Sequence, residues 1–381
     1  MQLIRIARDL RVDFFRGLAL WWIFTDHVPS DVLGDFSLRN FALCDATEVF
    51  VLLAGYGAGL AYGRALDQHG WLYAGADVVR RTWTLYVAHI FLFVVFAAQV
   101  AYSAAALDRA DYLDEIHLDA LGDSPYRAML EALLLRFQPA YLNILPLYVV
   151  LLAMFAFALP LLRRPRVLLA GSALLYAWAR AVQFNLPSWT GGGWFFNPLT
   201  WQLLFVIGAI LAYSPATLDV PRRQMNILAA LATAGGLAVV WLVWPYQSVI
   251  DALPPVLSRA LLSIDKSGLH PMRLISVLGL AWIAARLIPR DAAWLRSRFA
   301  APFVLAGQHS LPVFCAGIFL SFLGRLAMEE DDGIWAQIWV NLAGAIALVL
   351  VAALAAWFRE KGAERPKPPP TLPPAVRADT A

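Results

Sequence analysis

Apolar stretches of roughly 15 to 25 residues alternate along this chain with short charged segments. A transmembrane helix needs about 20 mostly apolar residues to cross the hydrocarbon core of a bilayer. Candidate stretches are residues 14–28, 47–66, 83–107, 140–162, 167–184, 199–213, 225–245, 272–288, 303–326 and 334–358. The pattern therefore predicts an all-α polytopic membrane protein of about ten transmembrane helices.

Composition agrees with this prediction. Of the 381 residues, 60% are hydrophobic and 15% are charged, whereas soluble domains are near half apolar and about a quarter charged. Only Cys44 and Cys315 are present, so neither a disulfide framework nor a metal site is expected.

The basic residues fall on alternate connecting segments, which is the distribution that orients membrane proteins and does not indicate nucleic-acid binding. They are Arg5, Arg8, Arg11, Arg80, Arg81, Arg163, Arg164, Arg166, Arg222, Arg223, Arg290, Arg296, Arg298, Arg359 and Lys361. This bias predicts that both termini are cytoplasmic and that acidic segments 108–123 and 329–332 are external. Residues 1–358 would form the bundle, and the proline-rich residues 359–381 a disordered cytoplasmic tail.

Charged side chains within the first apolar stretch require an explanation, because ionisable groups in a membrane are costly and usually functional. Arg16 and His27 are eleven residues apart, which places them on one face of a helix and about 16 Å apart along it. A cation and an imidazole on one stripe suit a long ligand with an anionic head and a reactive far end, such as an acyl-coenzyme A. Alternatively, Asp13 and Arg16 form an interfacial pair, and His27 is a hydrogen-bonded interfacial histidine.

The second apolar stretch begins with Glu48 at the depth of His27. A carboxylate beside an imidazole fixes its tautomer and raises its basicity, as a general base requires. Gly55, Gly59 and Gly63 recur every four residues, and such a stripe lets another helix approach closely.

Three further groups have both a structural and a functional interpretation. Arg80 and Arg81 are orientation charges or grip donor phosphates, and His309 packs in the interior or lines a donor channel. The external segment SWTGGGWFFNPLTWQ, with Trp189, Trp194 and Phe195, is an aromatic belt or a surface that stacks on sugar rings. No HExxH, CxxC or GxSxG motif occurs, which argues against metalloproteases and ordinary serine hydrolases.

Several of these segments resemble the acyltransferase-3 superfamily of membrane proteins. Arg16 and His27 match its arginine–ten residues–histidine motif; EVFVLLAGYGAG (48–59), RRTWTLY (80–86) and AGQHSLPVFCAG (306–317) resemble its other conserved segments. Glu48 and Ala54 replace the more usual Asp and Ser. The closer likeness is to the OpgC family, carried by ILPLYVVLL (144–152), GGWFFNPLTWQLLF (192–205), DKSGLHPMRLISVLGLAW (265–282) and GQHSLPVFC (307–315), although Asn143 stands where an Asp is expected.

The resemblance implies an O-acyltransferase of the bacterial inner membrane that moves succinyl from cytoplasmic succinyl-coenzyme A to a periplasmic glucan. His27 would be the general base and Glu48 its orienting carboxylate. The expected donor site is Arg16, Arg80, Arg81 and His309; the acceptor site is Trp189, Trp194, Phe195 and Asn197; auxiliary residues are Asp13, Gly55 and Gly59. The expected partners are these two substrates and the lipid bilayer, with no permanently bound cofactor and no metal.

Two hypotheses from other classes compete with this one. Ten spans with buried charges also suit a transporter or flippase, although such proteins often show two matching halves and no internal match is evident. A non-catalytic scaffold is a third possibility, but it leaves His27 unexplained.

Overall fold

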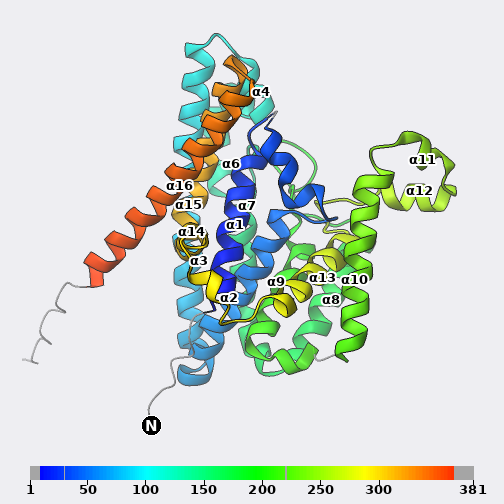
Figure 1. Ribbon diagram of the computed structural model, residues 1–381. Helices are drawn as coiled ribbons and strands as arrows, with labels where there is room; N and C mark the ends of the chain where they lie inside the picture. Colours follow the sequence, from blue (N-terminus) through cyan, green and yellow to red (C-terminus); the bar gives the residue numbers. More distant parts are fainter. Residues whose placement is uncertain (1–8, 30, 219–220, 364–381) are drawn as a thin grey trace, which may run out of the picture.

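The computed structural model describes residues 9–29, 31–218 and 221–363 (Figure 1). Within these ranges the chain is helical, and the one strand-like feature is an isolated bridge between Pro187 and Gly193. The all-α prediction is therefore confirmed for this part of the chain. Arg5, Arg8 and residues 364–381 of the predicted tail lie outside the described residues.

Helices occupy all ten predicted positions. They are α1 (Leu10–Asp26), α2 (Ala46–His69), α3 (Trp71–Ala106), α7 (Ile144–Ala158), α8 (Pro165–Ala181), α9 (Pro198–Tyr213), α10 (Arg222–Ala238), α13 (Pro271–Leu287), the pair α14 (Ala301–Gln308) and α15 (Ser310–Glu330), and α16 (Ile334–Ala363). Six described segments are long and apolar enough to cross a membrane: Ala46–His69, Trp71–Ala106, Ile144–Arg163, Arg222–Val243, Ser310–Glu330 and Ile334–Lys361. The chain is thus a membrane protein, while the count of ten spans stays a prediction.

Helix α3 differs most from its predicted bounds. It has 36 residues and begins at Trp71, twelve residues before the predicted start. Its length of about 54 Å exceeds the thickness of a hydrocarbon core, which is about 30 Å. The segment after it, predicted as an acidic loop, contains three short helices: α4 (Asp111–Ile116), α5 (Asp119–Asp123) and α6 (Pro125–Leu133).

The ninth predicted helix is interrupted. His309 has φ −118° and ψ 41° and separates α14 from α15. Pro312 follows three residues later, and a proline ring clashes with the carbonyl of the residue four positions earlier, which here is Gln308. Helix α16 continues to Ala363, five residues beyond the predicted end of the last apolar stretch at residue 358.

Glycines bring the central helices into backbone contact. A Cβ on Gly55 or Gly59 of α2 would overlap the carbonyl of Phe205 or Ala209 on α9. Gly17 of α1 and Gly307 of α14 approach each other's helices in the same way. Small residues at these crossings permit close helix packing in membranes, and they fix the register of α1 and α2, which carry the site.

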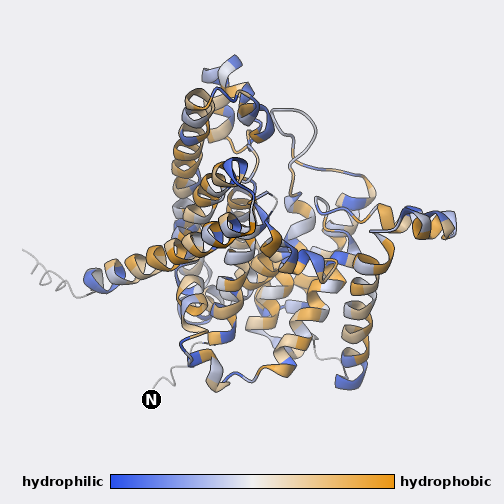
Figure 2. Cartoon of the chain, turned by 45° about the horizontal axis from the view of Figure 1, so that its top comes forward, coloured by the Kyte–Doolittle hydropathy of each residue, from blue (hydrophilic) through white to orange (hydrophobic). Residues whose placement is uncertain are grey.

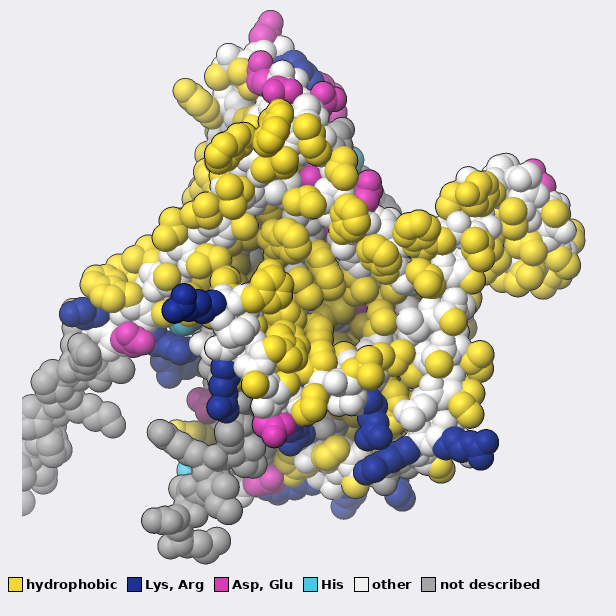
Figure 3. Space-filling view, viewed as in Figure 1, with side chains coloured by type: hydrophobic (Ala, Val, Ile, Leu, Met, Phe, Trp, Pro, Cys, Tyr) yellow, Lys and Arg dark blue, Asp and Glu magenta, His cyan; other side chains and the backbone are white. Residues whose placement is uncertain are grey.

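The remaining elements flank this centre. Helices α10 and α13 stand together on one side, and α11 (Gln247–Ala252) and α12 (Pro255–Leu262) project sideways from them (Figure 1). Apolar residues run along the helices while polar residues concentrate at the ends and in the connections (Figure 2). Figure 3 shows Lys and Arg side chains mostly toward one end of the visible face and Asp and Glu gathered at the other, near α4. This polarity accords with the predicted orientation, which remains a prediction.

Candidate functional site

His27 lies at the end of α1, and the backbone fixes its ring. Its Nδ1 is 2.5 Å from the carbonyl oxygen of Ile23. A carbonyl oxygen only accepts hydrogen bonds, so Nδ1 carries the proton and donates. The Nε2 atom therefore keeps its lone pair, which is the form a general base requires.

Tyr141 packs edge-on against His27, with ring centroids 4.5 Å apart and planes at 90°. Its backbone has φ +71°, a left-handed conformation that costs roughly 1–2 kcal/mol for a residue with a Cβ. Backbone hydrogen bonds hold its segment in place: Ala140 donates to Ile116 at 2.9 Å, and Trp189 donates to Arg136 at 2.8 Å. Because its ring packs against that of His27, Tyr141 belongs to the candidate site.

Arg325 interacts with Tyr141. Burial raises the pKa of Tyr141, and a hydrogen bond and the charge of Arg325 oppose that shift. The guanidinium of Arg325 also pairs with Glu115 and, at 2.8 Å, with Glu329. Tyr141 thus contacts the imidazole of His27 and interacts with an anchored arginine.

The hydrogen bonds of Glu48 go to residues other than His27, its predicted partner. Its Oε1 accepts from Nε of Arg273 at 2.7 Å, and its Oε2 accepts from the backbone N–H of Asp45 at 2.9 Å. Glu48 is the third residue of α2, where a carboxylate turns back to close a capping box. The Ile23 carbonyl fixes the imidazole instead.

Asp45 joins this cluster to a second cation. Its carboxylate lies 2.6 Å from Nζ of Lys266 and 3.2 Å from the guanidinium of Arg273. Burial alone would raise the pKa of Asp45, but the charges of Lys266 and Arg273 outweigh it and the pKa is lowered. Lys266 and Asp45 also act electrostatically on His27. Asp45, Glu48, Lys266 and Arg273 are thus linked by ion pairs into one cluster, called the acid–base cluster below.

The sequence did not single out Tyr141, Arg325, Asp45, Lys266 or Arg273. A weak signal existed for Lys266 and Arg273, because both stand in the segment 265–282 that resembles the OpgC family. Nothing in the local pattern marked Tyr141 or Arg325.

The predicted donor residues are dispersed. Arg16 donates to the carbonyl of Leu53 at 2.9 Å and lies 4.0 Å from the carboxylate of Asp13, so it ties α1 to α2. Arg80 is exposed on α3 and Arg81 is partly buried there, while His309 is buried at the break between α14 and α15. Donor binding by these residues stays a prediction.

The predicted acceptor residues divide into two groups. Trp194 and Asn197 are only 5% and 6% exposed, and Asn197 caps α9 through Leu199 while donating to the carbonyl of Phe184. Both side chains are thus buried within the described loop, and acceptor binding by Trp194 and Asn197 stays a prediction. Phe195 is 49% exposed, and Trp189 is partly buried against Phe137, which leaves these two rings for an acceptor.

Comparison with known proteins gives one family. The protein-family model described as OpgC protein matches residues 8–360 of the chain. This range includes every site residue discussed above. No curated protein matches the chain, and no solved structure matches it.

Proposed function

Because this chain belongs to the OpgC protein family, we propose that it is a membrane O-acyltransferase that succinylates a periplasmic glucan from cytoplasmic succinyl-coenzyme A. Family membership points to a glucan-modifying, acyltransferase-like function. The observation that carries the proposal is the hydrogen bond from Nδ1 of His27 to Ile23, because it leaves Nε2 as a base.

The proposed reaction needs only one proton carrier. Nε2 of His27 takes the proton of a glucan hydroxyl as that oxygen attacks the thioester carbonyl. The resulting tetrahedral species collapses, the carbon–sulfur bond breaks, and the proton passes from His27 to the departing sulfur. The products are a glucan ester and free coenzyme A, so atoms and charges balance without a metal or cofactor.

The neighbouring residues hold the imidazole of His27 in position and provide the surrounding charges. Tyr141 is a positioning residue that confines the imidazole through the edge of its ring. The acid–base cluster joins the start of α2 to α13 through ion pairs of Arg273 with Asp45 and Glu48. Arg16, Arg80, Arg81 and His309 stay the proposed donor residues, and Phe195 with Trp189 the proposed acceptor surface.

The test uses purified full-length protein in detergent with succinyl-coenzyme A and a glucan oligosaccharide. Free coenzyme A and the mass of the glucan are measured together, and acetyl-coenzyme A tests the donor. His27→Ala should lower the rate by about 10²–10⁴, the usual loss when a general base is removed. His69→Ala is the matched control, because His69 is an exposed histidine at the far end of α2.

Two results would count against the proposal. A His27→Ala rate close to that of the wild type would exclude His27 as the base. Because detergent abolishes the two compartments, a transporter should form no ester at all, so absence of product from folded wild-type protein with every donor would favour the transporter hypothesis.

A further inference from the structure

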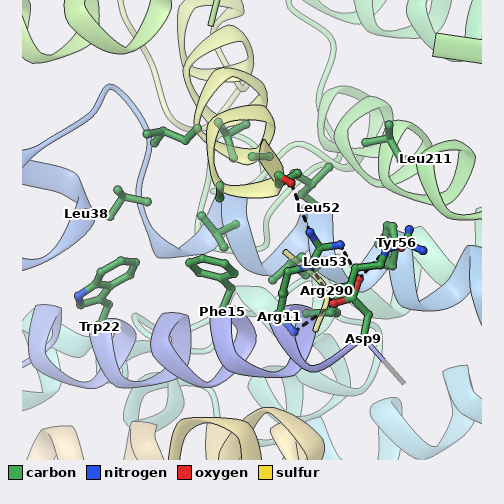
Figure 4. A pocket seen from close by; sticks show the side chains of 17 residues that line it. Asp9, Arg11, Phe15, Trp22, Leu38, Leu52, Leu53, Tyr56, Leu211 and Arg290 are labelled. Carbon is green, nitrogen blue, oxygen red and sulfur yellow. Dashed lines mark hydrogen bonds and ion pairs between the residues drawn. The ribbon is translucent and has the colours of Figure 1, made fainter. Parts of the chain in front are cut away.

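A groove of about 380 Å³ separates α13 from α1 and α2 (Figure 4). Phe15 and Trp22 of α1, Leu52 of α2 and Leu280 and Ala281 of α13 contribute to its walls. Figure 3 shows apolar side chains around a hollow in this part of the molecule. The groove is therefore an apolar recess between helices of a membrane protein.

The groove is charged at one end only. Asp9, Arg11 and Arg290 lie together there, and Trp22 and Leu38 lie at the opposite end (Figure 4). Arg11 donates hydrogen bonds to the carboxylate of Asp9 and, at 2.8 Å, to the carbonyl oxygen of Ile288. Arg290 is 72% exposed, with its Nε 3.5 Å from Asp9. The two cations and one anion leave a net positive charge, presented mainly by Arg290.

The length of the groove matches one leaflet of a bilayer. Arg11 and Trp22 are eleven residues apart on one helix, which corresponds to about 16 Å. A hydrocarbon core of about 30 Å gives each leaflet about 15 Å. A single lipid chain can therefore run from the charged end to Trp22 while its headgroup stays at the membrane surface.

The lining favours a hydrocarbon chain over the arm of coenzyme A. That arm carries amide groups, and buried amides without hydrogen-bond partners are unfavourable by a few kcal/mol. Between the charged end and Trp22 the lining side chains are apolar apart from Tyr56. Moreover, Arg11, Phe15 and Trp22 lie about 110–150° around the same helix from the middle of the Arg16–His27 stripe.

We propose that this groove binds one acyl chain of an anionic glycerophospholipid, with the phosphate beside Arg290. The lipid fills the space between α13 and the α1–α2 pair. Helix α13 carries Arg273 of the acid–base cluster, so the bound lipid also steadies that cluster. A ligand that binds only the folded state raises the free energy of unfolding by RT ln(1 + [L]/Kd), where [L] is the free ligand concentration.

The experiment is native mass spectrometry of delipidated full-length protein in neutral detergent, titrated with phosphatidylglycerol or phosphatidylcholine. One phosphatidylglycerol should be retained, and more tightly than phosphatidylcholine. Arg290→Gln should weaken phosphatidylglycerol binding about fivefold, the effect of one cation near an anionic headgroup. Arg286→Gln is the matched control, because Arg286 is exposed at the same end of α13 but does not line the groove.

Ala281→Phe places a ring inside the groove and should abolish retention of the lipid. If this variant does not fold, the comparison of Arg290→Gln with Arg286→Gln still decides the question. Equal binding by wild type and Arg290→Gln, or by folded Ala281→Phe, would overturn the proposal. Displacement of the lipid by succinyl-coenzyme A would also overturn it and assign the groove to the donor.

Discussion

Tyr141 provides a test in which two variants should differ in stability but not in activity. Its φ of +71° is unfavourable for any residue with a Cβ, by roughly 1–2 kcal/mol, and glycine adopts it freely. Tyr141→Ala and Tyr141→Gly both remove the ring that contacts His27 and Phe96, and they differ only in the Cβ. The glycine variant should therefore be the more stable of the two by about 1 kcal/mol.

Activity should not follow this order. Without the ring edge 4.5 Å away, the imidazole loses one wall, and a misplacement of about 1 Å lowers a rate by about 10². Both variants should lose activity to a similar extent, with the loss in kcat and little change in donor KM. Tyr141→Phe keeps the ring and should retain most of the activity, because it loses only the contact with Arg325.

Thermal unfolding in detergent, followed by tryptophan fluorescence, gives the stability, and coenzyme A release gives the rate. Gln183 is the control: it has φ +52° and is exposed after α8. Gln183→Gly should be more stable than Gln183→Ala, with unchanged rates. If Tyr141→Ala were more stable than Tyr141→Gly, the backbone strain at Tyr141 would be refuted. Full activity in both variants would refute its positioning role.

Three other predictions test the charges, the packing and the orientation. Arg273→Met leaves Glu48 buried without its cation and should destabilise the protein by about 3–5 kcal/mol. Adding Glu48→Gln to this variant should recover part of the lost stability, and additive losses in thermal unfolding would contradict the pairing. Gly307→Ala places a methyl group against the backbone of α1 and should destabilise the protein by about 1–3 kcal/mol or more. The control is Gly171→Ala in α8, which has open space around it and should stabilise the protein slightly. Equal melting temperatures of the two variants would contradict the close crossing. Thr190→Cys in a variant lacking Cys44 and Cys315 should react with an impermeant thiol reagent in intact spheroplasts, since Thr190 is exposed; labelling only after membrane permeabilisation would reverse the predicted orientation.

The sequence alone determined the features that depend on local periodicity. Apolar stretches predicted the positions of the helices, since each must satisfy its own backbone hydrogen bonds in a membrane. Helical geometry placed Arg16 and His27 on one stripe, and α1 is continuous between them. Even so, local pattern missed the first twelve residues of α3 and the interruption at His309.

Tertiary structure decided which groups meet. Glu48 was expected at His27, but it pairs with Arg273, 225 residues further along the chain. Tyr141 reached His27 through a strained loop held by hydrogen bonds to other segments. Periodicity fixes the direction of a side chain from its own helix, but a partner is chosen by which helices cross and at what register. Here backbone contacts at Gly17, Gly55, Gly59 and Gly307 accompany those crossings, and no single segment of sequence specifies them.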